Sequence, residues 1–132
     1  MKYMLDTNIC IFIIKKDMNV LSKLKNIDFK EICISSITLS ELEYGAAKSM
    51  YYEKNKKALQ DFIYYFSVLP FDSDAAYEYG KIRAALEKKG STIGCMDMLI
   101  ASHAKSQNLT LVTNNTREFS KINHLNLEDW KK

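Results

Sequence analysis

The sequence has few of the residues that mark unusual protein classes. Its 132 residues include one proline and four glycines, with 47% hydrophobic and 27% charged residues. This composition excludes a collagen-like, low-complexity or disordered chain. The three cysteines, Cys10, Cys33 and Cys95, are odd in number and form no CxxC pair. We therefore expect reduced thiols, without a disulfide framework or a zinc knuckle. The length of the chain predicts one domain, spanning residues 1–132.

Long hydrophobic runs are also missing. The longest, residues 9–14, is far shorter than the roughly 20 residues that a membrane-spanning helix requires. Asp6 before it and Lys15 and Lys16 after it do not suit a signal peptide. The sequence therefore predicts a cytoplasmic protein that does not engage a membrane.

A strong excess of one charge is absent as well. The formal net charge is +3, which is compatible with a nucleic-acid partner but does not by itself argue for one. Seventeen of the nineteen cations are lysines, and several of them cluster at positions 15–16, 54–57 and 88–89. We interpret these clusters as solvated helix faces, with contact to a phosphate backbone as the alternative.

The familiar catalytic signatures are missing too. The sequence contains no GxSxG elbow, no GxxxxGK phosphate loop and no GxGxxG fingerprint. Its two histidines, His103 and His124, have no cysteines or spaced acids nearby, so we interpret them as packed or solvated residues. Five tyrosines on the middle helices either pack into the core or expose rings for base stacking or a protein interface: Tyr44, Tyr51, Tyr52, Tyr64 and Tyr65.

Short apolar runs alternate with helical patterns along the whole chain. This alternation predicts an α/β fold, a three-layer α/β/α domain whose short central sheet is mainly parallel. A capping box, Thr38 to Glu41, predicts the start of one helix, and Gly90 predicts the end of another. The strands are expected at 3–5, 31–34, 67–69, 109–113 and 125–127, and the helices at 9–14, 20–25, from 38, 53–66, 72–90, 96–107 and 117–121.

Four carboxylates stand at the points where the predicted strands end or the next helices begin. They are Asp6, Glu41, Asp97 and Glu118. Each also has a local explanation. Asp6 can be a helix N-cap, and Glu41 the glutamate of the capping box. Asp97 can be a first-turn acid, and Glu118 a surface residue.

The carboxyl ends of parallel strands share one edge of the sheet, so these acids are expected to converge there. Clustered carboxylates raise one another's pKa, and a convergent group therefore implies a bound cation. Because the ligands would all be oxygens, Mg²⁺ or Mn²⁺ is the expected ion. Four polar residues beside these acids are candidates for supporting hydrogen bonds: Thr7, Asn8, Thr113 and Asn115.

A carboxylate-held divalent ion indicates phosphate chemistry. Such an ion orients a phosphodiester and lowers the pKa of an attacking water, as in metal-dependent nucleases and phosphatases. The spacing of the acids does not choose between these two classes.

Four ordered segments resemble the motifs of PIN-domain ribonucleases, and more narrowly those of VapC toxins from bacterial type II toxin–antitoxin pairs. The likeness spans the whole chain, including residues 127–130. The segments are YMLDTNI at 3–9, SSITLSEL at 35–42, IGCMDMLIA at 93–101 and LVTNNTREF at 111–119.

The resemblance implies an endoribonuclease that depends on Mg²⁺ or Mn²⁺, with Asp6, Glu41 and Asp97 as metal-binding acids. Many PIN domains have an aspartate where this chain has Asn115, and Glu118 is the nearest acid able to take its place. The implied substrate is structured RNA, with tRNA as the expected class.

The resemblance also implies partners. A VapB-type antitoxin would wrap the toxin with its C-terminal segment and present an arginine to the acidic pocket. The toxin is expected to form a homodimer, and operator DNA is reached only through the antitoxin. Two alternatives stay open: a binding module that acts mainly with its antitoxin in operon autoregulation, and a small phosphatase.

Overall fold

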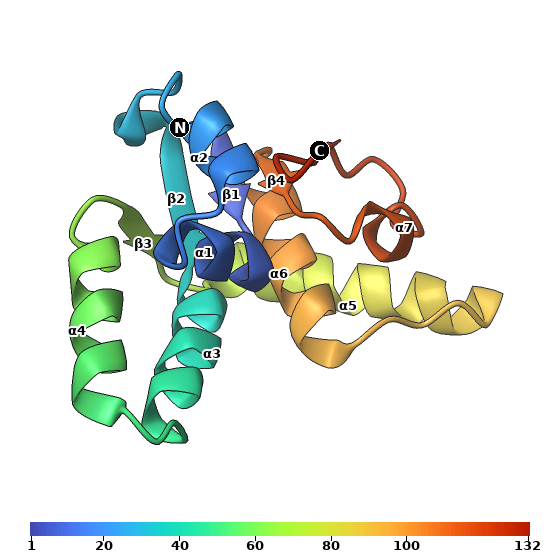
Figure 1. Cartoon of the computed structure of the whole chain (residues 1–132). Helices are drawn as coiled ribbons and strands as arrows, with labels where there is room; N and C mark the ends of the chain where they lie inside the picture. Colours follow the sequence, from blue (N-terminus) through green and yellow to red (C-terminus); the bar gives the residue numbers. More distant parts are fainter.

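The computed structural model describes residues 1–132, in which a twisted sheet lies between two groups of helices (Figure 1). All strand pairings are parallel, and the strand order is β3-β2-β1-β4-β5. The predicted three-layer α/β/α architecture and its order of elements are thereby confirmed. The strands are β1 (Tyr3–Leu5), β2 (Ile32–Ser35), β3 (Ser67–Leu69), β4 (Thr110–Val112) and β5 (Leu127–Glu128).

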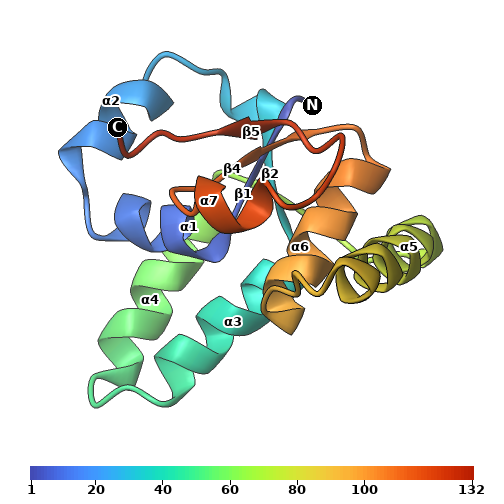
Figure 2. The same cartoon turned by 90° about the vertical axis from the view of Figure 1, so that its right-hand side faces the viewer.

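Two groups of helices cover the two faces of the sheet. In Figure 2, α5 and α6 lie together on the side away from α1 and α2. None of the helices combines the length and the apolar character needed to cross a bilayer. The helices are α1 (Thr7–Ile14), α2 (Met18–Leu24), α3 (Ser36–Ala47), α4 (Tyr52–Ile63), α5 (Ser73–Lys89), α6 (Cys95–Ser106), α7 (Thr116–Phe119) and the short 3-10 helix η1 (Phe29–Glu31).

The alternation of side chains along the central strand divides the core in two. Tyr3 and Leu5 of β1 pack into a cluster with α1, α2, α3 and α4, whereas Met4 packs into a second cluster with α5, α6 and α7. Successive residues of a strand point to opposite faces, so an uninterrupted apolar strand is what a sheet covered on both sides requires. The consequence is that β1 is buried along its whole length.

The start of α3 differs from the prediction. The helix begins at Ser36, and its cap is Ser35, whose Oγ accepts from the Ile37 N–H at 3.0 Å. The capping box from Thr38 to Glu41 is therefore wrong as a helix start. Because β2 extends through Ser35, the chain enters the helix earlier, and Glu41 lies in the middle of α3 with its side chain free of any capping role.

His103 joins α6 to the start of α3. Its Nδ1 lies 2.7 Å from Ser35 Oγ, and its ring packs edge-on against Phe71 with centroids 5.5 Å apart. Burial disfavours the imidazolium and lowers the pKa of His103. The interpretation of His103 as a packed residue is confirmed, and His124 is exposed in a turn.

Two glycines of α5 provide a matched test of its end. Gly90 caps the helix at a φ of 69°, whereas Gly80 is exposed in the helix interior, and an added Cβ meets nothing within 4 Å at either site. We expect Gly90→Ala to lower the free energy of unfolding by about 1 kcal/mol, because alanine is strained in the left-handed region. Gly80→Ala should raise it by about 1 kcal/mol, because alanine favours a helix interior. Urea unfolding of both variants measures the two effects, and a shared sign would contradict this account.

Candidate active site

Asp6 lies at the centre of the carboxyl edge of the sheet. It follows β1, which β2 and β4 flank, and its side chain is 5% exposed. Its Oδ1 accepts from the Ile9 N–H at 2.9 Å, so the same carboxylate caps α1. The predicted N-cap role of Asp6 is therefore present together with its position at the sheet edge.

Burial gives Asp6 an unusual acidity. The pKa of Asp6 rises from 3.8 to about 6, chiefly because burial removes water from the charged form. Hydrogen bonds from the Thr113 side chain and the Ile9 N–H oppose this rise, while the negative charges of Asp97 and Glu41 add to it. The pKa of Asp6 thus lies about one unit below neutral pH, and the charges of two other acids at this edge contribute to it.

Glu41 reaches the same edge from α3. The Thr7 hydroxyl donates to Glu41 Oε1 at 2.5 Å, joining the first residue of α1 to the middle of α3. These residues are 34 positions apart in the chain. Thr7 therefore orients the Glu41 carboxylate, as a supporting residue would.

Asp97 lies in the first turn of α6 and is half-buried. Its Oδ2 would be 3.7 Å from a Cβ built on Gly94, so the carboxylate folds back over the start of its own helix, where the helix dipole favours a negative charge. Burial is the largest cause that raises the pKa of Asp97, followed by the charges of Glu41 and Glu118. Asp97 is therefore coupled to Asp6, to Glu41 of α3 and to Glu118 of α7.

Glu118 lies at the margin of this group. It is in α7 and pairs with Lys121 at 3.3 Å, and its charge acts on Asp97. The Asn115 backbone N–H donates to Thr113 Oγ1 at 2.9 Å, but the Asn115 side chain makes no hydrogen bond. Asn8 is exposed and likewise makes none. Of the four polar residues expected near the acids, Thr7 and Thr113 contact carboxylates and the two asparagines do not.

The four acids meet at one edge but do not form a ready chelate. No three His, Cys, Asp or Glu side chains lie close enough to hold one metal ion. Asp6 Oδ1 is engaged as a helix cap, and Glu41 Oε1 accepts from Thr7. The donor set, all carboxylate oxygen, fits a hard divalent cation. Shared coordination requires these side chains to turn toward a common point.

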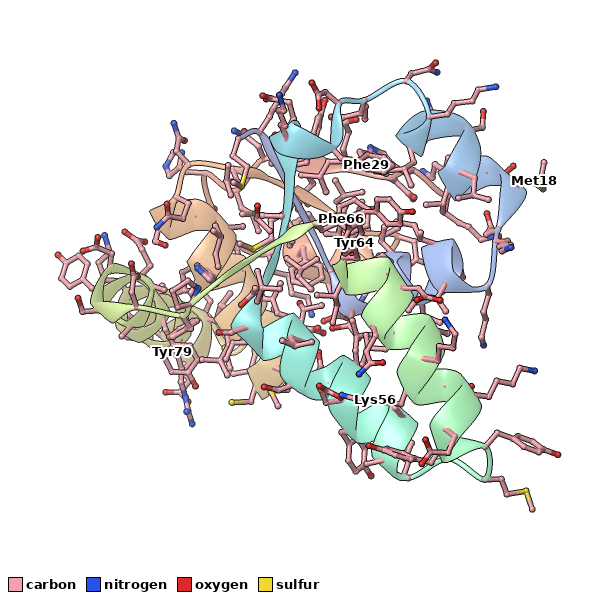
Figure 3. All side chains as sticks on the ribbon, turned by 90° about the vertical axis from the view of Figure 1, so that its left-hand side faces the viewer. Met18, Phe29, Lys56, Tyr64, Phe66 and Tyr79 are labelled. Carbon is pink, nitrogen blue, oxygen red and sulfur yellow. The ribbon has the colours of Figure 1, made fainter.

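A long apolar hollow begins at Glu41 and runs between α1, α3 and α4. Its first part, of about 270 Å³, shares Ile14 and Ala58 with a second part of about 600 Å³, which extends to Phe29 and Phe66. We call this surface the α1–α4 groove. Figure 3 shows Phe29 and Phe66 side by side near the end of α4, where their ring centroids are 5.2 Å apart. The groove was not foreseen from the sequence.

The five tyrosines of the middle helices lie outside the core. All are exposed, which favours the interface or stacking interpretation over core packing: Tyr44, Tyr51, Tyr52, Tyr64 and Tyr65.

The acidity of Asp6 predicts how stability changes with pH in metal-free buffer. Its folded pKa, about 6, exceeds its ordinary value of 3.8, so this group stabilises the fold fully below pH 4 and the contribution is lost as pH rises through 6. Asp6→Asn keeps an N-cap acceptor and cannot ionise. From pH 4 to pH 7, the variant should gain about 2 kcal/mol over the wild type in the free energy of unfolding.

Asp17→Asn is the control, because Asp17 changes stability with pH in the opposite direction to Asp6. Asp17 caps α2, and its hydrogen bond with Lys131 is the first cause that lowers its pKa. Its stabilising effect is therefore present above pH 4 and fades as pH falls below that value. Urea unfolding at several pH values tests both variants. Strong destabilisation by Asp6→Asn at pH 7 would show that Asp6 acts as a cap alone.

Comparison with known proteins places this chain and its fold in a family. The sequence profile of the PIN domain matches residues 3–125. The chain is 46% identical over 130 residues to the "tRNA(fMet)-specific endonuclease VapC" of Shigella flexneri, covering 98% of both chains. It is 45% identical over 136 residues to "Ribonuclease VapC2" of Rickettsia felis, covering both chains completely.

Solved structures with a similar fold include VapBC complexes. The DNA-bound VapBC complex of Salmonella typhimurium contains a chain that superposes with a TM-score of 0.94 at 47% identity, covering 98% of both chains. VapBC2 of Rickettsia felis, bound to a DNA fragment from its promoter, gives a TM-score of 0.91 at 44% identity, covering 98% of this chain and 99% of that one. The chain therefore belongs to the PIN-domain family and, within it, to the VapC ribonucleases.

Proposed function

We propose that this chain is the toxin of a type II toxin–antitoxin pair and an endoribonuclease that hydrolyses phosphodiester bonds of RNA, with tRNA as its substrate class. The observation that carries the proposal is that the charges of Asp97 and Glu41 raise the pKa of Asp6, and the charge of Glu41 that of Asp97, at one sheet edge. Perturbed acids gathered at the carboxyl edge of a parallel sheet are typical of a reaction site. Relatives at 46% and 47% identity are named as endonucleases specific for tRNA(fMet).

Within this proposal Asp6, Glu41 and Asp97 bind Mg²⁺ or Mn²⁺, and Glu118 completes the acidic set. The chemistry that such an ion supplies when bound is stabilisation of charge on the phosphodiester oxygens and a lower pKa for an attacking water. Thr7 holds the Glu41 carboxylate in one orientation. Thr113 favours the charged form of Asp6, which is the form that binds a cation.

The antitoxin is the partner proposed for the α1–α4 groove. The groove is apolar along most of its length and ends at Glu41, so an extended or helical segment can bury apolar side chains there and bring a cation to the acids. The similar VapBC structures are toxin–antitoxin complexes, two of them bound to DNA. We place operator DNA on the antitoxin, the toxin in the cytoplasm, and a toxin homodimer in the complex.

One observation gives the binding-module alternative its weight. Because no three acids lie within shared reach of an ion, a chain that kept this arrangement would bind its antitoxin and cut RNA weakly or not at all. Cleavage by the antitoxin-free protein separates the two functions. A phosphatase would instead hydrolyse a phosphomonoester and ignore RNA.

Asp97→Asn tests the nuclease directly. The substitution removes one negative ligand while keeping the size of the side chain, so RNA cleavage should fall by roughly 100-fold or more, equivalent to several kcal/mol of lost transition-state stabilisation. The measurement is the cleavage rate of the antitoxin-free protein on total tRNA with Mg²⁺, together with mapping of RNA ends in cells after induction. EDTA should abolish cleavage by the wild type.

Asp74→Asn is the matched control, because Asp74 is also a first-turn aspartate but lies exposed on α5 and is not among the charges that raise the pKa of Asp6 or Asp97. Its cleavage rate should stay within about twofold of the wild type. If Asp97→Asn cleaves RNA at the wild-type rate, the proposed nuclease site is wrong. If the wild type neither cleaves RNA nor arrests growth, the binding module is the better description.

Ala58→Arg tests the antitoxin site. Ala58 lines both parts of the α1–α4 groove, so a long cation there should weaken capture by the cognate antitoxin by roughly tenfold or more. Gln60→Arg, on the exposed face of the same helix, should leave capture within about twofold. Affinity is measured with immobilised antitoxin, and melting temperatures verify folding. Equal effects of the two variants would place the antitoxin elsewhere.

A further inference from the structure

A second concave surface lies on the α5 and α6 side of the sheet, remote from the α1–α4 groove. It has a volume of about 190 Å³ and lies between α5, α6 and residues 121–123, which follow α7. Its floor is apolar, and no carboxylate lines it. Its walls carry four lysines, Lys81, Lys89, Lys105 and Lys121, and we call it the lysine groove.

Contacts with neighbouring groups hold these lysines in place. Glu78 lies 3.3 Å from Lys81 and 4.0 Å from Lys105, and Glu118 lies 3.3 Å from Lys121. Lys89 has no carboxylate partner, and its amine donates to the Lys121 carbonyl at 3.4 Å. Four cations therefore face two carboxylates, which leaves the groove positive.

No other hollow on the molecule has this charge. Each of the remaining three contains a single lysine among its lining residues: Lys15, Lys25 and Lys16. The lysine groove is therefore the one concave surface with clustered cations, although the whole chain carries a net charge of only +3. The four lysines come from α5, from α6 and from the segment after α7, so folding alone brings them together.

The lysine groove meets the acidic edge at Lys121. Lys121 follows Glu118 by three residues, about one helical turn of 5.4 Å, and the charge of Glu118 acts on Asp97. Glu118 of α7 thus contacts Lys121 of the groove and acts on Asp97 of the acidic edge.

The acids create a difficulty that the lysine groove resolves. Four carboxylates without a bound metal ion repel a polyanion, and cations nearby offset this repulsion. Lysine ammonium groups bind phosphates as point charges and release counterions from the backbone, without reading base identity. The arrangement suits phosphates that lie next to the bond held at the acids.

We propose that the lysine groove binds the sugar-phosphate backbone of the RNA substrate beside the acidic edge and so positions it. The proposal rests on the proposed function for the nature of the substrate. It assigns Lys81, Lys89, Lys105 and Lys121 as positioning residues that act through the backbone.

The test is RNA binding by the antitoxin-free, full-length protein in EDTA, where cleavage is excluded. The probe is a fluorescein-labelled, single-stranded RNA of 20 nucleotides and mixed sequence, followed by fluorescence anisotropy at several KCl concentrations. Lys81→Gln with Lys89→Gln should raise Kd on the order of tenfold at 0.1 M KCl. It should also reduce the slope of log Kd against log salt by about 1.4, since each single-strand phosphate contact contributes about 0.7.

The matched control is Lys54→Gln with Lys57→Gln on α4. This pair removes the same charge as the α5 pair. As in the α5 pair, one lysine, Lys54, has no carboxylate partner, and the other, Lys57, forms an ion pair within its own helix, with Asp61 at 3.1 Å. Its Kd should stay within about twofold of the wild type. Lys81→Arg with Lys89→Arg keeps the charge and should bind like the wild type.

The outcomes separate this proposal from the proposed function. Equal weakening by the two glutamine pairs, or no weakening by the α5 pair, overturns the lysine groove as an RNA site. If the α5 pair alone weakens binding, the groove stands, even where the wild type shows no metal-dependent cleavage. If the α5 pair binds normally while Asp97→Asn has lost cleavage, the nuclease stands and the groove proposal fails.

Discussion

The burial of the Asp6 carboxylate at the end of the central strand is the constraint on which the rest of the site depends. Removal of water raises the pKa of Asp6 to about 6, and the fold partly offsets this with the Ile9 N–H and the Thr113 side chain. An isolated carboxylate there would simply protonate, and a cation would favour its charged form. The fold thus maintains a destabilised charge at its centre, which is typical of reaction sites.

The acidic edge has a different surface on each side. On one side, Glu41 belongs both to the acids and to the α1–α4 groove, so a partner in that groove reaches the acids directly. On the other side, Glu118 joins the acids to the lysine groove through Lys121. The apolar surface suits a protein segment and the cationic surface suits a polyanion. Inhibitor and substrate are therefore proposed to approach one set of carboxylates from opposite sides.

Much of the fold followed from local patterns. The order of strands and helices was predicted correctly because hydrophobic periodicity and turn residues act over short distances. The start of α3 was wrong because two serines and a capping box competed within seven residues, and the end of β2 decided the outcome in favour of Ser35. The sequence did not decide whether Tyr64 and Tyr65 pack into the core or face solvent, because helical spacing does not say how many faces of α4 other elements cover. Both residues are exposed.

The sequence alone determined where carboxylates stand relative to strand ends, and that Asp6 caps a helix, because these are relations between neighbouring residues. Only the tertiary structure decided which acids interact. Thr7 meets Glu41 across 34 residues, and the charge of Glu118 acts on Asp97. The lysine groove likewise exists only after α5, α6 and α7 have packed. Charge coupling depends on distance and burial, and neither is a property of the chain before it folds.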